Sequence, residues 1–314
     1  MNIIDQKFNE LTNCIDNLTE EELFINIRNH FFQIPKETQK SLENYFQEFD
    51  YWGTLNIETG DYQEIENRAH SLKKHLADAR WLYQNLQDYT SKKLLYAILN
   101  NWYHYDFATL KTVSNNPYCH YFDLDIISQT KNEILVDLGA YIGDTVLDYI
   151  DTYGTNSYDK IYCYEITDSS YALLKNNLSK YENIVYKKLG ISDKTETMYL
   201  DTNSNSSSAN RVTETGNIKV KLTSLDEDIQ EPITTIKMDI EGGEQKAILG
   251  SRNHIQKDNP KLLISVYHNF DDLFEIPKMI AKINPNYHYY LRNYGGNIFP
   301  TEIVLFAIPK KEND

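Results

Sequence analysis

The segment Val136–Thr145, VDLGAYIGDT, contains the residues whose types and spacing most clearly suggest a ligand site. It begins as an apolar run typical of a buried strand, and Asp137 lies close to the end of that run. Gly139 and Gly143 would allow the backbone to turn sharply and to approach a ligand closely. A helix beginning near Asp144 would direct its unpaired N–H groups and the positive end of its dipole to the same place. We therefore expect a ligand to bind between this strand and this helix.

The spacing of these glycines argues against a dinucleotide. The dinucleotide fingerprint, G-x-G-x-x-G, separates its first two glycines by one residue. Here Tyr141 and its neighbours separate Gly139 from Gly143 and fill the positions where a pyrophosphate would require bare backbone. The carboxylates of Asp137 and Asp144 would also repel a phosphate. A ligand with a positive centre and an amino acid part suits these residues better, and S-adenosylmethionine has both.

A second acidic residue, Glu165, ends another apolar run in the sequence CYEI. At this place in a doubly wound sheet, a carboxylate can accept hydrogen bonds from both ribose hydroxyls. Because NAD enzymes use an acid here too, Glu165 indicates a ribose and does not name the cofactor. The alternative is that Glu165 merely flanks the N-terminus of the next helix.

A third feature is the segment Ile236–Gly250, IKMDIEGGEQKAILG. Asp239 ends an apolar run, and Glu241 and Glu244 follow in the turn. Ligands of open α/β sheets bind outside the carboxyl ends of the strands, and carboxylates gathered there are costly unless a positive or hydrogen-bonding group meets them. A sulfonium, an ammonium or a divalent metal would serve. For Glu244 we favour a structural role, as a first-turn acid stabilised by the helix dipole.

His268 follows a further apolar run in the sequence ISVYH. An imidazole near its reference pKa of about 6.5 can take a proton from a hydroxyl at neutral pH. We therefore consider His268 a candidate general base. The alternative is a loop histidine that only packs or caps.

The second half of the chain must position these residues, and its pattern predicts an α/β fold. Short apolar runs alternate with helical patterns, which gives a doubly wound, mostly parallel sheet with helices on both faces. The last two runs lack a long helix between them and should pair antiparallel at one edge. The predicted strands are Ile134–Leu138, Lys160–Glu165, Ile184–Lys188, Ile233–Asp239, Leu262–Tyr267, Tyr287–Leu291 and Ile303–Ile308. The predicted helices are Asp144–Tyr153 and Asp168–Lys180, with Asp168 as N-cap, Gly243–Leu249, closed by Gly250, and Leu273–Ile283.

The first half of the chain is rich in Asn, Gln, Glu and Tyr and shows helical spacing of its apolar residues. We expect an N-terminal helical domain over residues 1–125 and a ligand-binding domain over residues 126–314. Within the latter, the polar segment Asp201–Asn210, DTNSNSSSAN, lies between two short β-like runs, Glu196–Leu200 and Ile218–Leu222. It is interpreted as a solvated hairpin tip or, alternatively, as a mobile lid.

The composition and charge of the chain limit the kinds of partner and the location that we expect. The 314 residues carry a formal net charge of −15, which would be repelled by a phosphate backbone, so we expect no nucleic acid partner. Apolar runs are far shorter than the ~20 residues of a membrane span, and the charged residues within Met1–Glu10 do not suit a secretory signal. Cys14, Cys119 and Cys163 are odd in number and widely spaced, which favours a reducing cytoplasm over disulfides or zinc.

Taken together, these motifs resemble the FkbM family of S-adenosylmethionine-dependent methyltransferases. VDLGAYIGDT, CYEI, LTSLDE, IKMDIEGGE, ISVYH and LRNY occur in the order and spacing of that family over about residues 120–308. The resemblance implies a class I methyltransferase (Rossmann-like) fold and O-methylation of a sugar or polyketide-type hydroxyl. It implies that Glu165 holds ribose, that Asp239 lies near the amino group or methyl of the donor, and that Ser192 lies on the adenine side. The methionine-side loop would comprise Asp137, Gly139, Ala140, Tyr141, Gly143, Asp144 and Thr145.

For the reaction, our hypothesis is that His268 is the base and that Asp239 and Glu241 orient donor and acceptor. A metal-assisted version would use the same three side chains as ligands, but no tight ligand spacing demands it. The expected acceptor is a sugar, a nucleotide sugar or a cell-envelope glycan, with a small non-sugar metabolite as the alternative. Two other classes stay open, a nicotinamide-dependent oxidoreductase and a non-catalytic binding module. The helical N-terminal domain could pair two subunits into a homodimer.

Overall fold

A computed structural model describes residues 2–49, 52–114, 117–128, 131–201, 211–216, 218–296 and 299–311. The chain forms two compact units, each made from more than one stretch of sequence. The first unit comprises Met1–Asn116, Val266–Pro277 and Tyr289–Val304, and the second comprises Pro117–Ser265, Lys278–His288 and Leu305–Asp314. The division into domains at residue 125 stays a prediction.

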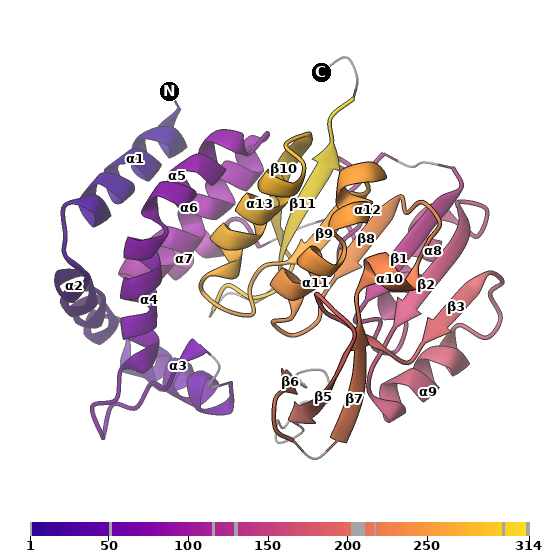
Figure 1. Ribbon diagram of the computed structural model, residues 1–314. Helices are drawn as coiled ribbons and strands as arrows, with labels where there is room; N and C mark the ends of the chain where they lie inside the picture. Colours follow the sequence, from indigo (N-terminus) through magenta and orange to yellow (C-terminus); the bar gives the residue numbers. More distant parts are fainter. Residues whose placement is uncertain are drawn as a thin grey trace. The chain divides into compact units, whose positions relative to one another are not determined.

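The first unit is mainly helical (Figure 1). Several of its helices begin at a residue whose side chain caps them. Asn2 and Asp5 form a capping box at the first helix, and Thr19 and Glu22 form another at the second. These boxes satisfy backbone N–H groups that a helix start leaves unpaired. The helices are α1 (Ile3–Asp16), α2 (Glu20–Gln33), α3 (Lys36–Glu48), α4 (Gln63–Lys74), α5 (Leu76–Asn85), α6 (Tyr89–His104) and α7 (Phe107–Lys111).

Buried aromatic rings hold the first unit together. Trp102 of α6 packs edge-on against Phe270 and Phe274, with ring centroids 5.0 and 6.0 Å apart. The guanidinium of Arg68 is buried over the ring of Tyr105, 4.5 Å from its centroid, and pairs with Glu64. The rings near the end of α6 therefore pack the core of this unit, where cation–π contact and the ion pair together compensate a buried charge.

A seven-stranded sheet has the order β10-β11-β9-β8-β1-β2-β3. The neighbours β1–β2, β2–β3, β1–β8 and β8–β9 pair parallel, so their carboxyl ends meet at one edge of the sheet. This is the predicted α/β fold with a mostly parallel sheet. The strands are β1 (Glu133–Leu138), β2 (Tyr158–Tyr164), β3 (Ile184–Lys187), β8 (Thr235–Met238), β9 (Lys261–Ser265), β10 (Tyr287–Asn293) and β11 (Ile303–Pro309).

Helices cover both faces of the parallel strands (Figure 1). The order β1-β2-β3 runs across the sheet in one direction and β8-β9 in the other, and crossovers between parallel strands are right-handed. The helices between β1 and β3 therefore lie on one face, and those between β8 and β9 on the other. The first set is α8 (Asp144–Tyr153) and α9 (Asp168–Asn177), and the second is α11 (Glu244–Gly250) and α12 (Arg252–Lys257). The remaining helices are α10 (Leu225–Asp228) and α13 (Asp272–Ile283).

A small second sheet has the order β4-β7-β5-β6. The β-like runs predicted at Glu196–Leu200 and Ile218–Leu222 form its antiparallel strands β5 and β7, whereas β4 and β6 were not predicted. Its apolar side chains Leu200, Val220 and Leu222 form a separate buried cluster. The predicted hairpin tip or lid at Asp201–Asn210 lies outside the described residues from 202 onward. The strands are β4 (Gly190–Ile191), β5 (Glu196–Asp201), β6 (Arg211–Thr213) and β7 (Ile218–Thr223).

Two predicted helix caps are wrong in detail. Thr167 is the N-cap of α9, and Asp168 is the first helical residue. Gly250 does not follow α11 but is its last residue. A Cβ at that position would lie 1.9 Å from the carbonyl oxygen of Ser192. Gly250 is therefore required by close packing against another segment rather than by a left-handed cap.

Candidate active site

The loop after β1 is shaped by close backbone contacts in the second unit. Gly139 N and Ala140 N both donate to the carbonyl oxygen of Tyr164 at the end of β2, at 3.1 and 2.9 Å. Gly139 has a φ of 80°, and a Cβ there would lie 1.9 Å from the carbonyl oxygen of Asp239. The loops after β1 and β8 thus touch at a position that only glycine fits. Tyr141, with a φ of 44°, also adopts the left-handed region, which is costly for a bulky residue.

Gly143 completes this loop as the residue that precedes α8. Its φ is 88°, and a Cβ there would meet the side chains of Leu174 and Leu178 at 3.0 Å. Asp144 and Thr145 then begin α8, as predicted. The loop with the two glycines therefore joins the carboxyl end of β1 to a helix N-terminus, which is the arrangement the sequence predicts.

Asp137 is paired within the protein. Its carboxylate is completely buried and lies 2.9 Å from Nζ of Lys237, whose ammonium also donates to the carbonyl oxygen of Gly139 at 2.8 Å. Burial opposes the charged form of Lys237, but the carboxylates of Asp137 and Asp239 outweigh it and raise the pKa of this lysine. The ammonium therefore stays charged and holds both the acid and the loop.

Lys237 was not among the residues singled out from the sequence. In the sequence it is a polar residue within the apolar run before Asp239. The strand register pairs it directly with Asp137 on the neighbouring strand β1. A lysine inside a buried parallel strand is costly without a partner. Its presence in this apolar run could therefore have indicated a buried ion pair.

Asp239 directly follows β8 and is held at both its backbone and its side chain. Its N–H donates to the carbonyl oxygen of Leu138 at 3.0 Å. Its Oδ2 accepts from the hydroxyl of Tyr121 at 2.7 Å, and that hydroxyl lies 3.0 Å from Oγ of Ser265. The structure thus brings Asp239 together with two residues that the sequence analysis did not consider as site residues.

Glu241 and Glu244 lie in different surroundings after Asp239, the first within the turn and the second at the start of α11. Glu241 has a φ of 57° and is followed by Gly242 at 94°, so the turn is tight and left-handed. Glu244 is buried in the first turn of α11, and its Oε1 accepts from the N–H of Ile240 at 2.8 Å. This is the structural, helix-start role favoured for Glu244 from the sequence.

Glu165 directly follows β2 and is buried. Its Oε1 accepts two hydrogen bonds from Thr167, from the N–H at 2.7 Å and from Oγ1 at 2.5 Å. This contact holds the chain at the start of α9, as the helix-flank interpretation of Glu165 requires. A ribose contact stays a prediction.

Ser192 lies just after β4 and is buried. Its N–H donates to the carbonyl oxygen of Thr223 at 2.9 Å, and its Oγ donates to Oδ1 of Asp193 at 3.1 Å. Its carbonyl packs against Gly250. Its predicted place on the adenine side is not tested by these contacts.

His268 belongs to the first unit, whereas Asp239 and Glu241 belong to the second. The imidazole is buried, and its ring centroid is 4.3 Å from that of Tyr267. The carbonyl oxygen of Tyr267 accepts from Nε1 of Trp52 at 3.1 Å, which ties this stretch to the loop before α4. Within the first unit, His268 is therefore held in a packed aromatic environment.

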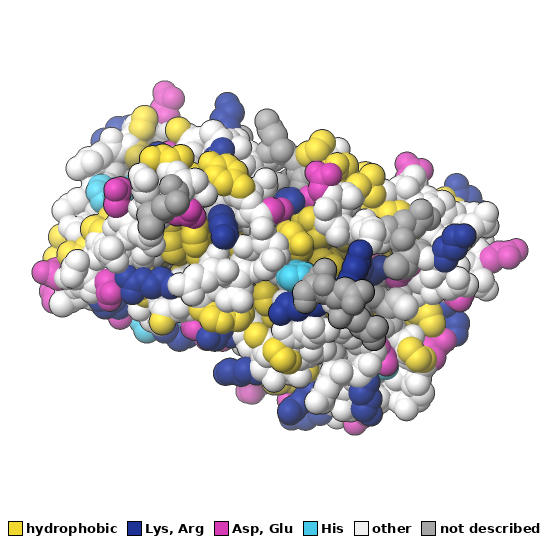
Figure 2. All heavy atoms as spheres, turned by 90° about the horizontal axis from the view of Figure 1, so that it is seen from above, with side chains coloured by type: hydrophobic (Ala, Val, Ile, Leu, Met, Phe, Trp, Pro, Cys, Tyr) yellow, Lys and Arg dark blue, Asp and Glu magenta, His cyan; other side chains and the backbone are white. Residues whose placement is uncertain are grey.

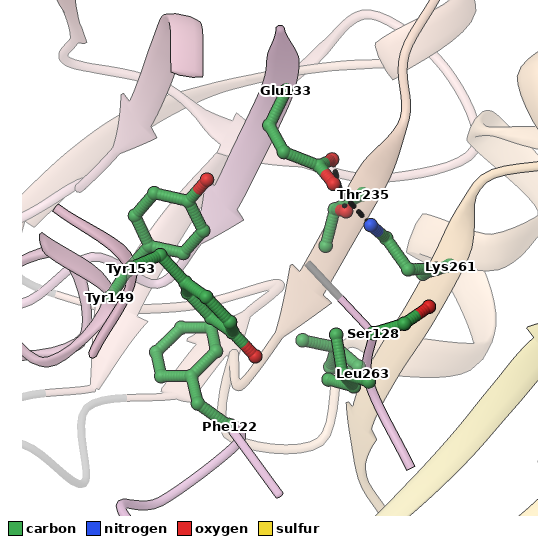
Figure 3. A pocket seen from close by; sticks show the side chains of 9 residues that line it. Phe122, Ser128, Glu133, Tyr149, Tyr153, Thr235, Lys261 and Leu263 are labelled. Atoms are coloured by element: carbon green, nitrogen blue, oxygen red, sulfur yellow. Dashed lines mark hydrogen bonds and ion pairs between the residues drawn. The ribbon is translucent and has the colours of Figure 1, made fainter. Parts of the chain in front are cut away.

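The second unit also has a cavity at the opposite edge of the sheet, at the amino ends of β1, β8 and β9 (Figure 3). Glu133 and Lys261 form an ion pair there, and Thr235 donates to the same carboxylate at 2.9 Å. None of the predicted site residues lines this cavity. Its lining residues are Phe122, Ile127, Ser128, Glu133, Tyr149, Tyr153, Thr235, Lys261 and Leu263.

On the face in Figure 2, acidic and basic side chains are interspersed among the described residues. None of the helices in the described part of the chain has the length and apolarity needed to cross a membrane.

Comparison with known proteins agrees with this geometry. The model of the methyltransferase FkbM domain matches residues 137–295, which is 159 of the 314 residues. The crystal structure of methyltransferase FkbM from Methylobacillus flagellatus KT is similar with a TM-score of 0.67 and 22% identity, over 86% of this chain and 70% of that chain. At this identity the match shows the fold. No curated protein sequence matches the chain.

Two further structures were solved with SAH or with S-adenosyl-L-methionine. A putative methyltransferase from Streptococcus mutans in complex with SAH has a TM-score of 0.38 and 13% identity, over 58% of this chain and 91% of that one. Fibrillarin from Aeropyrum pernix with natively bound S-adenosyl-L-methionine has a TM-score of 0.37 and 10% identity, over 58% and 69%. Both scores are too low to support an argument about this chain.

The sheet order is that of a mostly parallel α/β fold, which the chain shares with the structure of methyltransferase FkbM. The chain belongs to the FkbM methyltransferase family, as its match to the family domain shows.

Proposed function

We propose that this methyltransferase uses S-adenosylmethionine and transfers the methyl group to a hydroxyl of a sugar, a nucleotide sugar or a cell-envelope glycan. The observation that supports the donor best is the loop after β1. It leads from Asp137, neutralised by Lys237, to the N-terminus of α8 through two glycines at left-handed φ. The sugar acceptor rests on the family resemblance, and the cytoplasmic location rests on the cysteine pattern.

The residues present fit this donor. Gly139 and Gly143 let the loop pack closely against Asp239 and against Leu174 and Leu178, which holds its backbone beside the N-terminus of α8. Asp239 and Glu165 directly follow β8 and β2 at the same edge of the sheet and would supply carboxylates for an amino group and for ribose hydroxyls. When bound, the donor supplies an activated methyl group.

The side chains of the protein must position the acceptor, exclude water and take up a proton. The acceptor oxygen must be held ~3 Å from the methyl carbon, and water must be excluded. A base must take the hydroxyl proton, and we assign this role to the imidazole of His268. Asp239 and Glu241 are assigned to orientation, Asp239 toward the donor and Glu241 toward the acceptor.

The donor assignment is tested by isothermal titration of the purified protein with S-adenosylhomocysteine and, separately, with NAD. We expect saturable binding of S-adenosylhomocysteine and none of NAD. Binding of NAD alone would overturn the assignment and favour an oxidoreductase. Labelled donor with a panel of nucleotide sugars and cell-envelope glycans would then identify the acceptor, and non-sugar hydroxyl compounds would serve as the comparison.

The base is tested by replacing His268 with Ala. Loss of a general base reduces turnover by about 10²- to 10⁴-fold, and we expect the affinity for S-adenosylhomocysteine to change little. Full turnover in this variant would remove His268 from the mechanism. Activity that survives dialysis against a chelator would exclude the metal-assisted version.

A further inference from the structure

Residues 117–128 precede the matched family domain, which begins at residue 137, and yet they belong to the second unit. Within this segment Tyr121 is buried and has a φ of 69°. Its hydroxyl donates to Oδ2 of Asp239 at 2.7 Å and lies 3.0 Å from Oγ of Ser265. Asp239 follows β8 and Ser265 ends β9. A residue from outside the family domain therefore meets the carboxyl ends of two neighbouring strands.

Packing fixes Tyr121 from several sides. The ring of His120 stacks on it, with centroids 4.0 Å apart and planes 3° from parallel. Nζ of Lys237 lies 5.3 Å from the centroid of the Tyr121 ring. Phe122, the next residue, packs edge-on against Tyr149 and Tyr153 of α8, as Figure 3 shows. The phenol is thus held by its neighbours before any ligand binds, which is what a preorganised site requires.

The backbone of β8 does not by itself determine how the carboxylate of Asp239 is turned. The terminal torsion of an aspartate is broad, so the plane of its carboxylate depends on hydrogen-bond partners. A phenol that donates to one carboxylate oxygen sets that plane. Because Tyr121 is fixed by its own packing, it can impose its orientation on Asp239 rather than follow it.

We propose that Tyr121 is a positioning residue of the methyl-transfer site, which holds the carboxylate of Asp239 in the orientation that binds the amino group of the donor. This inference rests on the proposed function. It extends the functional part of the second unit upstream of the family domain, into residues 117–128.

The test compares three single variants by isothermal titration with S-adenosylhomocysteine. Tyr121→Phe removes one oxygen and keeps the ring, and we expect about tenfold weaker binding, the effect of losing one hydrogen bond to a charged acceptor. Ser265→Ala keeps the phenol but removes its second contact, and we expect about a threefold weakening. Tyr158→Phe is the control, because its hydroxyl donates to the carbonyl oxygen of Glu182 at 3.1 Å, at the amino end of β2. Its affinity should equal that of the wild type.

A double-mutant cycle separates positioning from general stability. If Tyr121 acts through Asp239, then Tyr121→Phe should change the affinity by less than about twofold in an Asp239→Ala background. A tenfold loss in both backgrounds would overturn the inference, and so would unchanged affinity in Tyr121→Phe. If Tyr121→Phe does not fold, the Ser265→Ala variant provides the test. An affinity of Ser265→Ala equal to that of the wild type would then overturn the inference. Failure of the wild type to bind S-adenosylhomocysteine would instead contradict the proposed function, and the inference with it.

Discussion

Two lysine–carboxylate pairs join strands of the large sheet, one at each end of its parallel strands, and they differ in what they hold. At the carboxyl ends, Lys237 and Asp137 lie 2.9 Å apart with side chains that are 3% and 0% exposed. At the amino ends, Lys261 and Glu133 pair with side chains that are 13% and 4% exposed. The first pair joins the neighbouring strands β8 and β1, and the second joins β9 and β1, which β8 separates. Burial of charge alone therefore does not distinguish the end of the sheet that carries the candidate site.

The surroundings of the two pairs do differ. Glu133 also accepts from the hydroxyls of Thr234 and Thr235, so this pair ties strands to one another. Lys237 instead donates to the carbonyl oxygen of Gly139 and thereby holds a loop in which residues adopt left-handed φ. We infer that a buried ion pair marks a ligand site when it holds the backbone of a loop outside the strands. A buried ion pair that only connects strands to one another has a structural role.

The largest expected effect is that of Lys237→Met. This change leaves the carboxylate of Asp137 buried without its partner, which costs about 3–5 kcal/mol of the free energy of unfolding. Binding of S-adenosylhomocysteine should be lost as well, because the loop loses its anchor. Urea unfolding and titration measure the two effects. The double variant Lys237→Met/Asp137→Asn should recover part of the stability, since no charge then remains buried, and a loss below about 1 kcal/mol in the single variant would contradict our account.

The second effect compares two glycines that share a φ of 80°. Gly139→Ala adds a Cβ 1.9 Å from the carbonyl oxygen of Asp239, whereas Gly154→Ala meets nothing within 4 Å. Gly154 has a ψ of 163°, so its backbone lies in a region that is essentially restricted to glycine, and the second change should cost about 1–3 kcal/mol for the backbone alone. The first should cost about 3 kcal/mol or more, because overlap is added to strain, and should abolish donor binding. Equal losses in the two unfolding curves would show that the loops after β1 and β8 are not in close contact.

Lys261→Met should have a smaller effect, confined to stability. Glu133 would keep the hydroxyls of Thr234 and Thr235 as donors, so we expect a loss of about 1–2 kcal/mol. The affinity for S-adenosylhomocysteine should not change. A tenfold weaker affinity in this variant would show that the two ends of the sheet do not have separate roles.

The smallest effect concerns alkaline pH. The carboxylates of Asp137 and Asp239 raise the pKa of Lys237 despite its burial. Its contribution to stability is therefore fully present below the unfolded-state value of about 10.4 and is lost as the pH rises through the higher folded-state value. Unfolding free energies at pH 8 and 11 should fall further in the wild type than in Lys237→Met. An equal fall in both proteins would mean that Lys237 does not titrate with folding.

The sequence predicted the parts of the site that depend on local chain geometry. The bounds of α8 and the glycines at 139 and 143 follow from residues within about ten positions of each other, where strand, turn and helix start succeed one another. The helix-start role of Glu244 is local in the same sense. These features need no knowledge of which strands become neighbours.

Residues that contact a partner on another strand could not be predicted from the local sequence. Lys237 faces Asp137 only because β1 and β8 pair parallel in this register, although 100 residues separate them in the chain. Tyr121 reaches Asp239 from a segment without regular structure. A single sequence gives the residue types at such positions but not the strand order that brings them together.

The burial of Cys163 has a practical consequence for labelling. It is the β2 partner of Asp137 in the strand register, and burial raises its pKa well above the usual range for a thiol, so it should resist thiol reagents. Cys14 and Cys119 are exposed, and they belong to the first and the second unit respectively. The unmodified chain thus offers one reactive handle on each unit. A pair of maleimide probes would report the separation of the units, with and without S-adenosylhomocysteine, without any engineered cysteine.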